Sequence, residues 1–196
     1  MAGPSCCRAS SRCSRQEKLL RSADDRHLQD AIAEGYARRD RSNMAPTIEY
    51  FTALLAQHPD HPEAIYEVGG AYDTAGEEER ARGFYERALA AGLQGDTRRR
   101  CLLQYGSTLR NLGLFDESIG VLREACSDYP DSDSLRVFLA LSLHAASRSD
   151  AAVAELLALA ADRIHSPDID RYEPALRGNA DYLRDLDAAT QERRPQ

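Results

Sequence analysis

The chain has 196 residues, of which 42% are apolar and 7% aromatic, enough for one domain or a short stack of repeats. Its formal net charge of −7 argues against nucleic acid as the main partner, because contact with phosphates requires a net basic surface. No apolar stretch is long enough for a signal peptide or a membrane span, so we expect a cytoplasmic protein with reduced cysteines and no membrane partner.

The first 14 residues, MAGPSCCRASSRCS, are small, polar and basic, and they show no apolar periodicity. We expect them to form a disordered tail. Cys6, Cys7 and Cys13 could bind zinc or form a redox pair, but their spacing matches no zinc motif and no second pair of ligands follows. A metal-dependent or redox regulator is therefore the least favoured function.

From Arg15 onward the pattern is helical almost throughout. Apolar residues between Leu19 and Ile32 predict one helix, or two short ones, reaching about Arg39. A second apolar run at 48–55 predicts the next helix. The segment HPDHP at 58–62 breaks the chain, and a helix can restart after it because proline suits a first helical turn.

Two helices joined by a short turn are predicted after this break, in the segment PEAIYEVGGAYDTAGEEERARGFYERALAAG. Apolar and small residues lie three or four positions apart in each helix, and Gly76 separates the two. The same order recurs with Gly113 at the turn, and again in weaker form with Ser147 at the turn. The sequence therefore predicts successive antiparallel helix hairpins.

Small residues mark the same place in every unit: Gly35, Gly69, Gly106 and Ala140, spaced by 34, 37 and 34 residues. A period of 34 with two helices per unit indicates a solenoid of stacked hairpins. We expect the three extra residues of the longer interval to fall in the loop AAGLQGDT. We also expect close helix crossings where Gly69 faces Ala81 and Gly106 faces Ser118, because such crossings admit only small side chains.

This order of residues resembles the signature of the tetratricopeptide repeat (TPR) family. The signature positions of one unit are filled by Ile65, Val68, Gly69, Tyr72, Gly76, Ala81, Tyr85 and Ala88. Those of the next are filled by Leu102, Tyr105, Gly106, Leu109, Gly113, Ser118, Leu122, Ala125 and Pro130. The resemblance covers roughly residues 28–165 and is weaker in the outer units, where Arg38, Thr47 and Arg136 depart from it. It implies a role in protein–protein interaction.

We therefore predict an all-α fold, a right-handed superhelical stack of antiparallel helix hairpins closed by a C-terminal capping helix. The repeat domain spans 15–165, with units at about 28–61, 62–98, 99–132 and 133–165, followed by the capping helix at 166–187 and a tail at 188–196. The apolar stripe of the capping helix consists of Ile169, Tyr172, Leu176, Leu183 and Leu186.

No motif of a hydrolase, nucleotide-binding or metalloprotease site is present, so we predict no enzyme, no cofactor and no small-molecule substrate. His58 and His61 form an HxxH pattern, but they lie beside two prolines between repeats, and we interpret them as turn residues rather than metal ligands. Cys101 and Cys126 lie at apolar helix positions and are expected in the core.

The candidate binding site is the concave groove that the resemblance places along the first helix of each hairpin. Its candidate residues are Tyr36, Arg39, Tyr66, Glu67, Asp73, Gln104, Arg110 and Asn111. Aromatic anchors beside polar side chains suit a peptide or protein partner. We expect Tyr66, Arg110 and Asn111 to project into the groove. We expect the adjacent residues Ile65 and Leu109 to point into the core, and Phe138 and Leu141 to pack on neighbouring helices.

A second candidate site is the run Arg98, Arg99 and Arg100, which opens a helix after the expected cap Asp96. Basic residues are unfavourable at a helix N-terminus. The run is either a solvated surface or a contact for an acidic partner. Self-association as a homodimer remains the alternative to partner binding.

Overall fold

A computed structural model describes residues 25–193, which form helices and connecting turns without a β-strand. Residues 25–37 are helical. The helices that follow are α2 (Ala45–Gln57), α3 (Pro62–Thr74), α4 (Glu78–Ala90), α5 (Gly95–Asn111), α6 (Phe115–Asp128), α7 (Asp133–Ala145), α8 (Ser149–Arg163) and α9 (Pro167–Glu192). The tail with Cys6, Cys7 and Cys13 lies outside the described residues.

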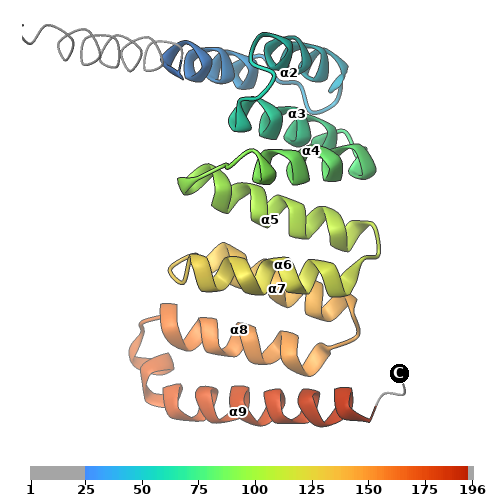
Figure 1. Ribbon diagram of the computed structural model, residues 1–196. Coiled ribbons are helices and arrows are strands. Elements are labelled where there is room, and N and C mark those ends of the chain that lie inside the picture. Colours follow the sequence, from blue (N-terminus) through green and yellow to red (C-terminus); the bar gives the residue numbers. More distant parts are fainter. Residues whose placement is uncertain (1–24, 194–196) are drawn as a thin grey trace, which may run out of the picture.

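The helices stack in chain order from one end of the molecule to the other, and α9 forms the last layer (Figure 1). Helix α3 pairs with α4, α5 with α6 and α7 with α8, and each pair packs on the next. The all-α solenoid predicted from the sequence is thereby confirmed. Three of the described helices have a proline in their first turn, and α3 begins at Pro62 as predicted.

The turn inside each of these hairpins contains one residue with a left-handed backbone. Gly76 and Gly113 have φ of 76° and 79°, and Ser147 has φ of 60° in the last hairpin. Glycine adopts this conformation without steric cost, whereas a residue with a Cβ adopts it less readily. All three were predicted as turn residues.

The close crossings predicted at the small residues are confirmed. A Cβ on Gly106 would lie 2.6 Å from Leu122 Cγ, and one on Gly69 would lie 2.9 Å from the ring of Tyr85. The opposing side chains are thus one turn beyond the expected Ser118 and Ala81. Ser118 still contributes, because its hydroxyl donates a 2.6 Å hydrogen bond to the Gly106 carbonyl.

The three extra residues of the second interval do not lengthen a loop, contrary to expectation. The segments 58–61, 91–94 and 129–132, which join successive hairpins, are equally long. Helix α5 has 17 residues, whereas α3 and α7 have 13 each. The insertion therefore adds nearly one turn to the start of α5, and this turn contains Asp96 and the first arginine of the run, Arg98.

The capping helix is longer than predicted, since α9 continues to Glu192 through what was expected to be a tail. It packs on α8 through Ala180, and Arg148 forms an ion pair with the buried Asp187 at 2.5 Å. Tyr172 is 54% exposed and is not part of the packing face, so that part of the predicted stripe is wrong.

Candidate functional site

The first helices of the hairpins form the inner side of the stack. Helix α3 contacts α5, and α5 contacts α7, whereas in the described residues no second helix contacts the second helix of the next hairpin. The stack therefore curves toward its first helices. We call the surface formed by the helix at 25–37, α3, α5 and α7 the inner face.

At the N-terminal end of the inner face, Tyr36 bridges two helices. It is 38% exposed, and its hydroxyl donates a 2.5 Å hydrogen bond to Glu67 Oε2 on α3. The guanidinium of Arg39 lies 5.0 Å from the centre of the Tyr36 ring. Tyr36 and Arg39 therefore form an accessible aromatic–cationic pair.

Glu67 is buried beneath this pair and is not available as a surface contact. Burial raises the pKa of its carboxyl to about 7, although the hydrogen bond from Tyr36 and the charge of Arg100 oppose the change. The carboxyl thus holds two helices together and changes charge near neutral pH.

Tyr66 is a core residue, and the prediction that it projects into the groove is wrong. Only 2% of it is exposed. Its ring packs 6.1 Å from that of Tyr85, and the guanidinium of Arg100 lies 6.0 Å from the ring centre. The physical reason is packing between hairpins, because Tyr66 lies in one buried cluster with Leu93, in the segment before α5, and with Cys101 of α5. Ile65 and Leu109 are buried as predicted.

The middle of the inner face uses its polar groups for packing between hairpins. Thr108 donates a 2.9 Å hydrogen bond to Asp73 Oδ1, and burial raises the pKa of Asp73. Tyr85 donates to Gln104 Oε1 at 3.2 Å. Asp73 and Gln104 therefore join α3 and α4 to α5.

Arg110 and Asn111 lie at the end of α5. Arg110 Nη2 donates to Ser107 Oγ at 3.0 Å, and its guanidinium lies 5.8 Å from the centre of the Phe138 ring on α7. Its Nη1 is enclosed and has no hydrogen-bond acceptor, and no acid of the described residues pairs with it. Partial burial lowers its pKa. Asn111 is exposed.

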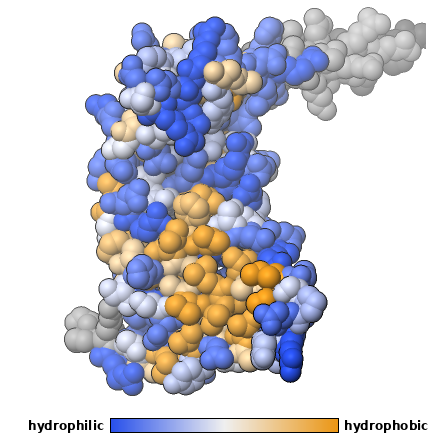
Figure 2. All heavy atoms as spheres, turned by 180° about the vertical axis from the view of Figure 1, so that it is seen from behind, coloured by the Kyte–Doolittle hydropathy of each residue, from blue (hydrophilic) through white to orange (hydrophobic). Residues whose placement is uncertain are grey.

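An apolar hollow between α7 and α8 is the feature that the sequence did not reveal. Figure 2 shows apolar side chains gathered at the C-terminal end of the stack. We call the hollow the terminal groove; it measures about 360 Å³ and is lined by Val137, Ala140, Leu141, His144, Ser149, Ala152, Val153 and Leu156. Leu141 is 46% exposed, so the expectation that it packs on a neighbouring helix is wrong, whereas Phe138 is partly buried.

The arginine run is tied to acids of the chain itself. Arg98 pairs with Asp128 at 3.1 Å, and Asp96 accepts from Arg99 at 2.7 Å and from Arg100 at 3.2 Å. Asp96 lies in the first turn and is not the cap, because the residue before the helix is Gln94. Ion pairing within the chain thus offsets the unfavourable position of the run.

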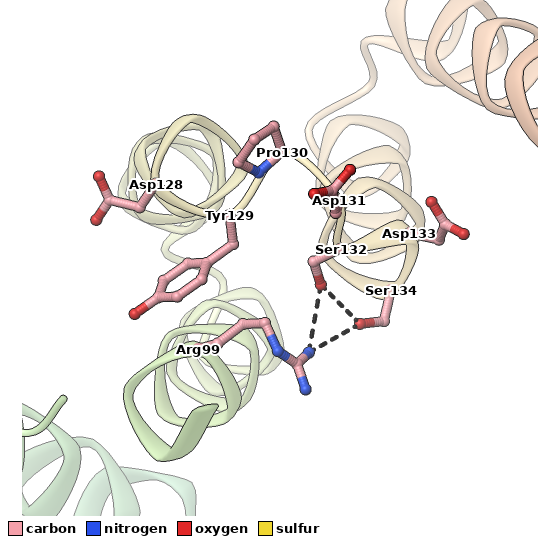
Figure 3. Close-up of a pocket in the computed structure, with 8 residues that line it drawn as sticks. All are labelled: Arg99, Asp128, Tyr129, Pro130, Asp131, Ser132, Asp133 and Ser134. Carbon is pink, nitrogen blue, oxygen red and sulfur yellow. Dashed lines mark hydrogen bonds between the residues drawn. The ribbon is translucent and has the colours of Figure 1, made fainter. Parts of the chain in front are cut away.

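Arg99 also reaches the next hairpin. Its Nη1 donates to Ser132 and Ser134 at the start of α7, and beyond these serines lie Asp131 and Asp133 (Figure 3). These side chains and Asp128 line a hollow of about 520 Å³. Because acids surround Arg99, an acidic partner would meet repulsion here as well as attraction.

No cluster of three metal-ligating side chains occurs within residues 25–193. The rings of His58 and His61 lie 6.5 Å apart in the turn before α3. Burial raises the pKa of the Cys101 thiol to about 12, which disfavours a reactive thiolate. Across the same range, none of the helices combines the length and apolar character needed to span a membrane.

Comparison with known proteins points to one family. The model of the tetratrico peptide repeat matches residues 62–183. No curated protein sequence matches. The solved structures that resemble the chain include MamA, with 17% identity, 82% of each chain covered and a TM-score of 0.58.

Two further structures share the fold. YrrB, described as a TPR protein with an unusual peptide-binding site, is 17% identical, with 76% of this chain and 79% of YrrB covered and a TM-score of 0.51. PilF of Pseudomonas aeruginosa is 20% identical, with 84% and 77% covered and a TM-score of 0.52.

Proposed function

Because the chain belongs to the tetratricopeptide repeat family, we propose that it is a protein-interaction scaffold that binds a protein or peptide partner on its inner face. The peptide-binding site described for YrrB, which shares the fold, supports this assignment. We assign no catalytic activity to the chain, since the inner-face residues Glu67, Asp73 and Gln104 are engaged in bonds between helices.

The observation that carries the proposal is the exposed apolar surface at the C-terminal end of the stack, where α7 of the inner face meets α8. Leu141, Val153 and Leu156 are each 45% to 46% exposed and line one hollow. A contiguous exposed apolar area on a soluble domain marks an interaction site more often than isolated exposed residues do. Arg110 and Asn111 lie at the end of the adjoining first helix and supply polar contacts.

Affinity capture from the native organism with the full chain tests the proposal. We expect wild type to retain a partner that the variants Arg110→Ala and Leu156→Gln lose, while helical circular dichroism stays unchanged. The variant with Arg98, Arg99 and Arg100 changed to Glu separates the two candidate sites. If only this variant loses the partner, the inner-face assignment is wrong. Capture of no protein by any version would contradict the scaffold function itself.

A further inference from the structure

The last hairpin leaves exposed a residue that the two preceding hairpins bury. Tyr85, Leu122 and Leu156 occupy the same repeat position, sixteen residues after Gly69, Gly106 and Ala140. Tyr85 and Leu122 are 0% exposed, whereas Leu156 is 45% exposed. All three residues are largely apolar, so the difference in exposure arises from the helix that packs over each of them.

The path of α9 explains this difference. Each first helix before it packs against the previous first helix, as α5 does on α3 and α7 does on α5. Helix α9 packs on α8, where Ala154 and Ala158 meet Ala180, but among the described residues its backbone does not come within 8 Å of the backbone of α7, measured between Cα atoms. The inner side of the last hairpin is therefore not covered as it is in the hairpins before it.

The exposed surface has the length and the spacing of side chains that are needed to bind a helix. On α8, Val153, Leu156, Ala160 and Ile164 lie three or four residues apart, which is a row roughly 16 Å long. A second hollow of about 360 Å³ continues the terminal groove and shares Leu156 with it. Grooves of this kind bind one apolar face of an amphipathic helix through side chains spaced i, i+3 or i+4, and i+7.

The charges at the two ends of this helix-binding surface differ. At one end Asp133 is already paired with Arg163 at 2.7 Å. At the other, His144 lines the groove. Arg110 lies over the ring of Phe138, three residues before the groove residue Leu141 on α7, and has no acidic partner among the described residues. A carboxylate brought by a partner would give the guanidinium a charged acceptor, which the chain itself does not supply.

We propose that the terminal groove binds an amphipathic helix of a partner protein, with the apolar face on Leu156 and an acidic side chain toward Arg110. The proposal rests on the proposed function and specifies the class of partner and its place. It differs from binding along the whole inner face, because the N-terminal half of that face uses its polar groups between helices.

A library of helical peptides displayed on phage, randomised on one face and selected on the full chain, tests the proposal. We expect enriched peptides with apolar residues at helical spacing and a flanking Asp or Glu. Leu156→Gln should weaken their binding roughly tenfold or more. Arg110→Ala should remove the preference for the acidic residue. Tyr182→Gln, at a position on α9 that is 61% exposed, is the control and should bind like wild type.

Val137→Thr, a change of similar volume at a 36% exposed groove residue, provides a second test that does not depend on the folding of the Leu156 variant. Enriched peptides that bind both groove variants like wild type, or that are basic, would overturn the inference and leave the scaffold function standing if affinity capture succeeds. Failure to enrich any peptide would also overturn it. Concentration-dependent dimers of the free chain that Leu156→Gln abolishes would assign the groove to a second copy instead.

Discussion

Gly106 illustrates how a single residue sets the distance between two helices. Its missing side chain lets α5 approach α6 until Leu122 lies where a Cβ would be. The Ser118 hydroxyl then reaches the Gly106 carbonyl on one side and the Ser142 hydroxyl, 2.8 Å away, on the other. One small position thereby links two hairpins through both packing and hydrogen bonding.

We predict that Gly106→Leu destabilises the chain by about 1–3 kcal/mol, because the added side chain must displace Leu122. Gly120→Leu on α6 is the matched control, since nothing lies within 4 Å of the Cβ position there. Urea unfolding followed by circular dichroism measures both. Equal midpoints for the two variants would show that the crossing at Gly106 has room to spare.

A second prediction concerns the buried carboxyl of Glu67, whose pKa rises from 4.5 to about 7 on folding. The folded chain therefore holds a proton that the unfolded chain releases between these values. The associated stability is present below about pH 4.5 and is lost as pH rises through 7, by on the order of 3 kcal/mol in total.

Glu67→Gln keeps an acceptor for Tyr36 and removes the titration. In urea unfolding between pH 5 and pH 8, the stability of wild type relative to this variant should fall with rising pH. A constant difference across that range would contradict the assigned pKa.

At the scale of the element, the turn of the last hairpin deviates from the preceding ones. Ser147 adopts the left-handed backbone that Gly76 and Gly113 provide in the other two hairpins. We predict that Ser147→Gly stabilises the chain by about 0.5–1 kcal/mol, because the strain from its Cβ disappears. Ala53→Gly within α2 should have the opposite sign. Thermal unfolding of the two variants checks this, and a lower midpoint for Ser147→Gly would refute it.

Helix α9 depends on the ion pair between Arg148 and Asp187, both largely shielded from solvent. The charge of Arg148 and its hydrogen bond hold the pKa of Asp187 below its usual value. Removing the carboxylate leaves a shielded guanidinium without its partner, at a cost of about 1–3 kcal/mol.

We predict that Asp187→Ala speeds hydrogen exchange in α9 while α3 and α4 keep their protection. Asp185→Ala, at an exposed position two residues away, should change neither. Uniform loss of protection along the whole chain would mean that α9 does not open separately.

The hairpins could be predicted from the sequence because the residues that specify them lie close together along the chain. Gly69 and Gly106 must be small at the crossings, and Gly76 and Gly113 must turn, so the period itself predicts the fold. The exposure of Tyr66 was mispredicted, since it depends on packing against Cys101 of the following helix α5. The terminal groove depends on which neighbours α9 touches, and no local pattern around Leu156 records that.

At the scale of the whole molecule, a solenoid has contacts only between successive layers, so its ends expose surfaces that its middle buries. In this chain, α9 covers α8 but not α7, and apolar side chains remain exposed at the C-terminal end of the stack (Figure 2). In the N-terminal half of the inner face, by contrast, hydrogen bonds join neighbouring helices through the side chains of Tyr36, Glu67 and Asp73. The two halves of the inner face therefore differ in how many groups they leave free for a partner, and we expect binding at the C-terminal half.

Hydrogen–deuterium exchange of the full chain, with and without a captured partner, tests most directly whether a partner binds at the C-terminal half of the inner face. Binding should slow exchange in α7, in α8 and at the end of α5 around Arg110, and leave α4 unchanged. Protection confined to α4 and α6, on the outer side of the stack, would contradict the account.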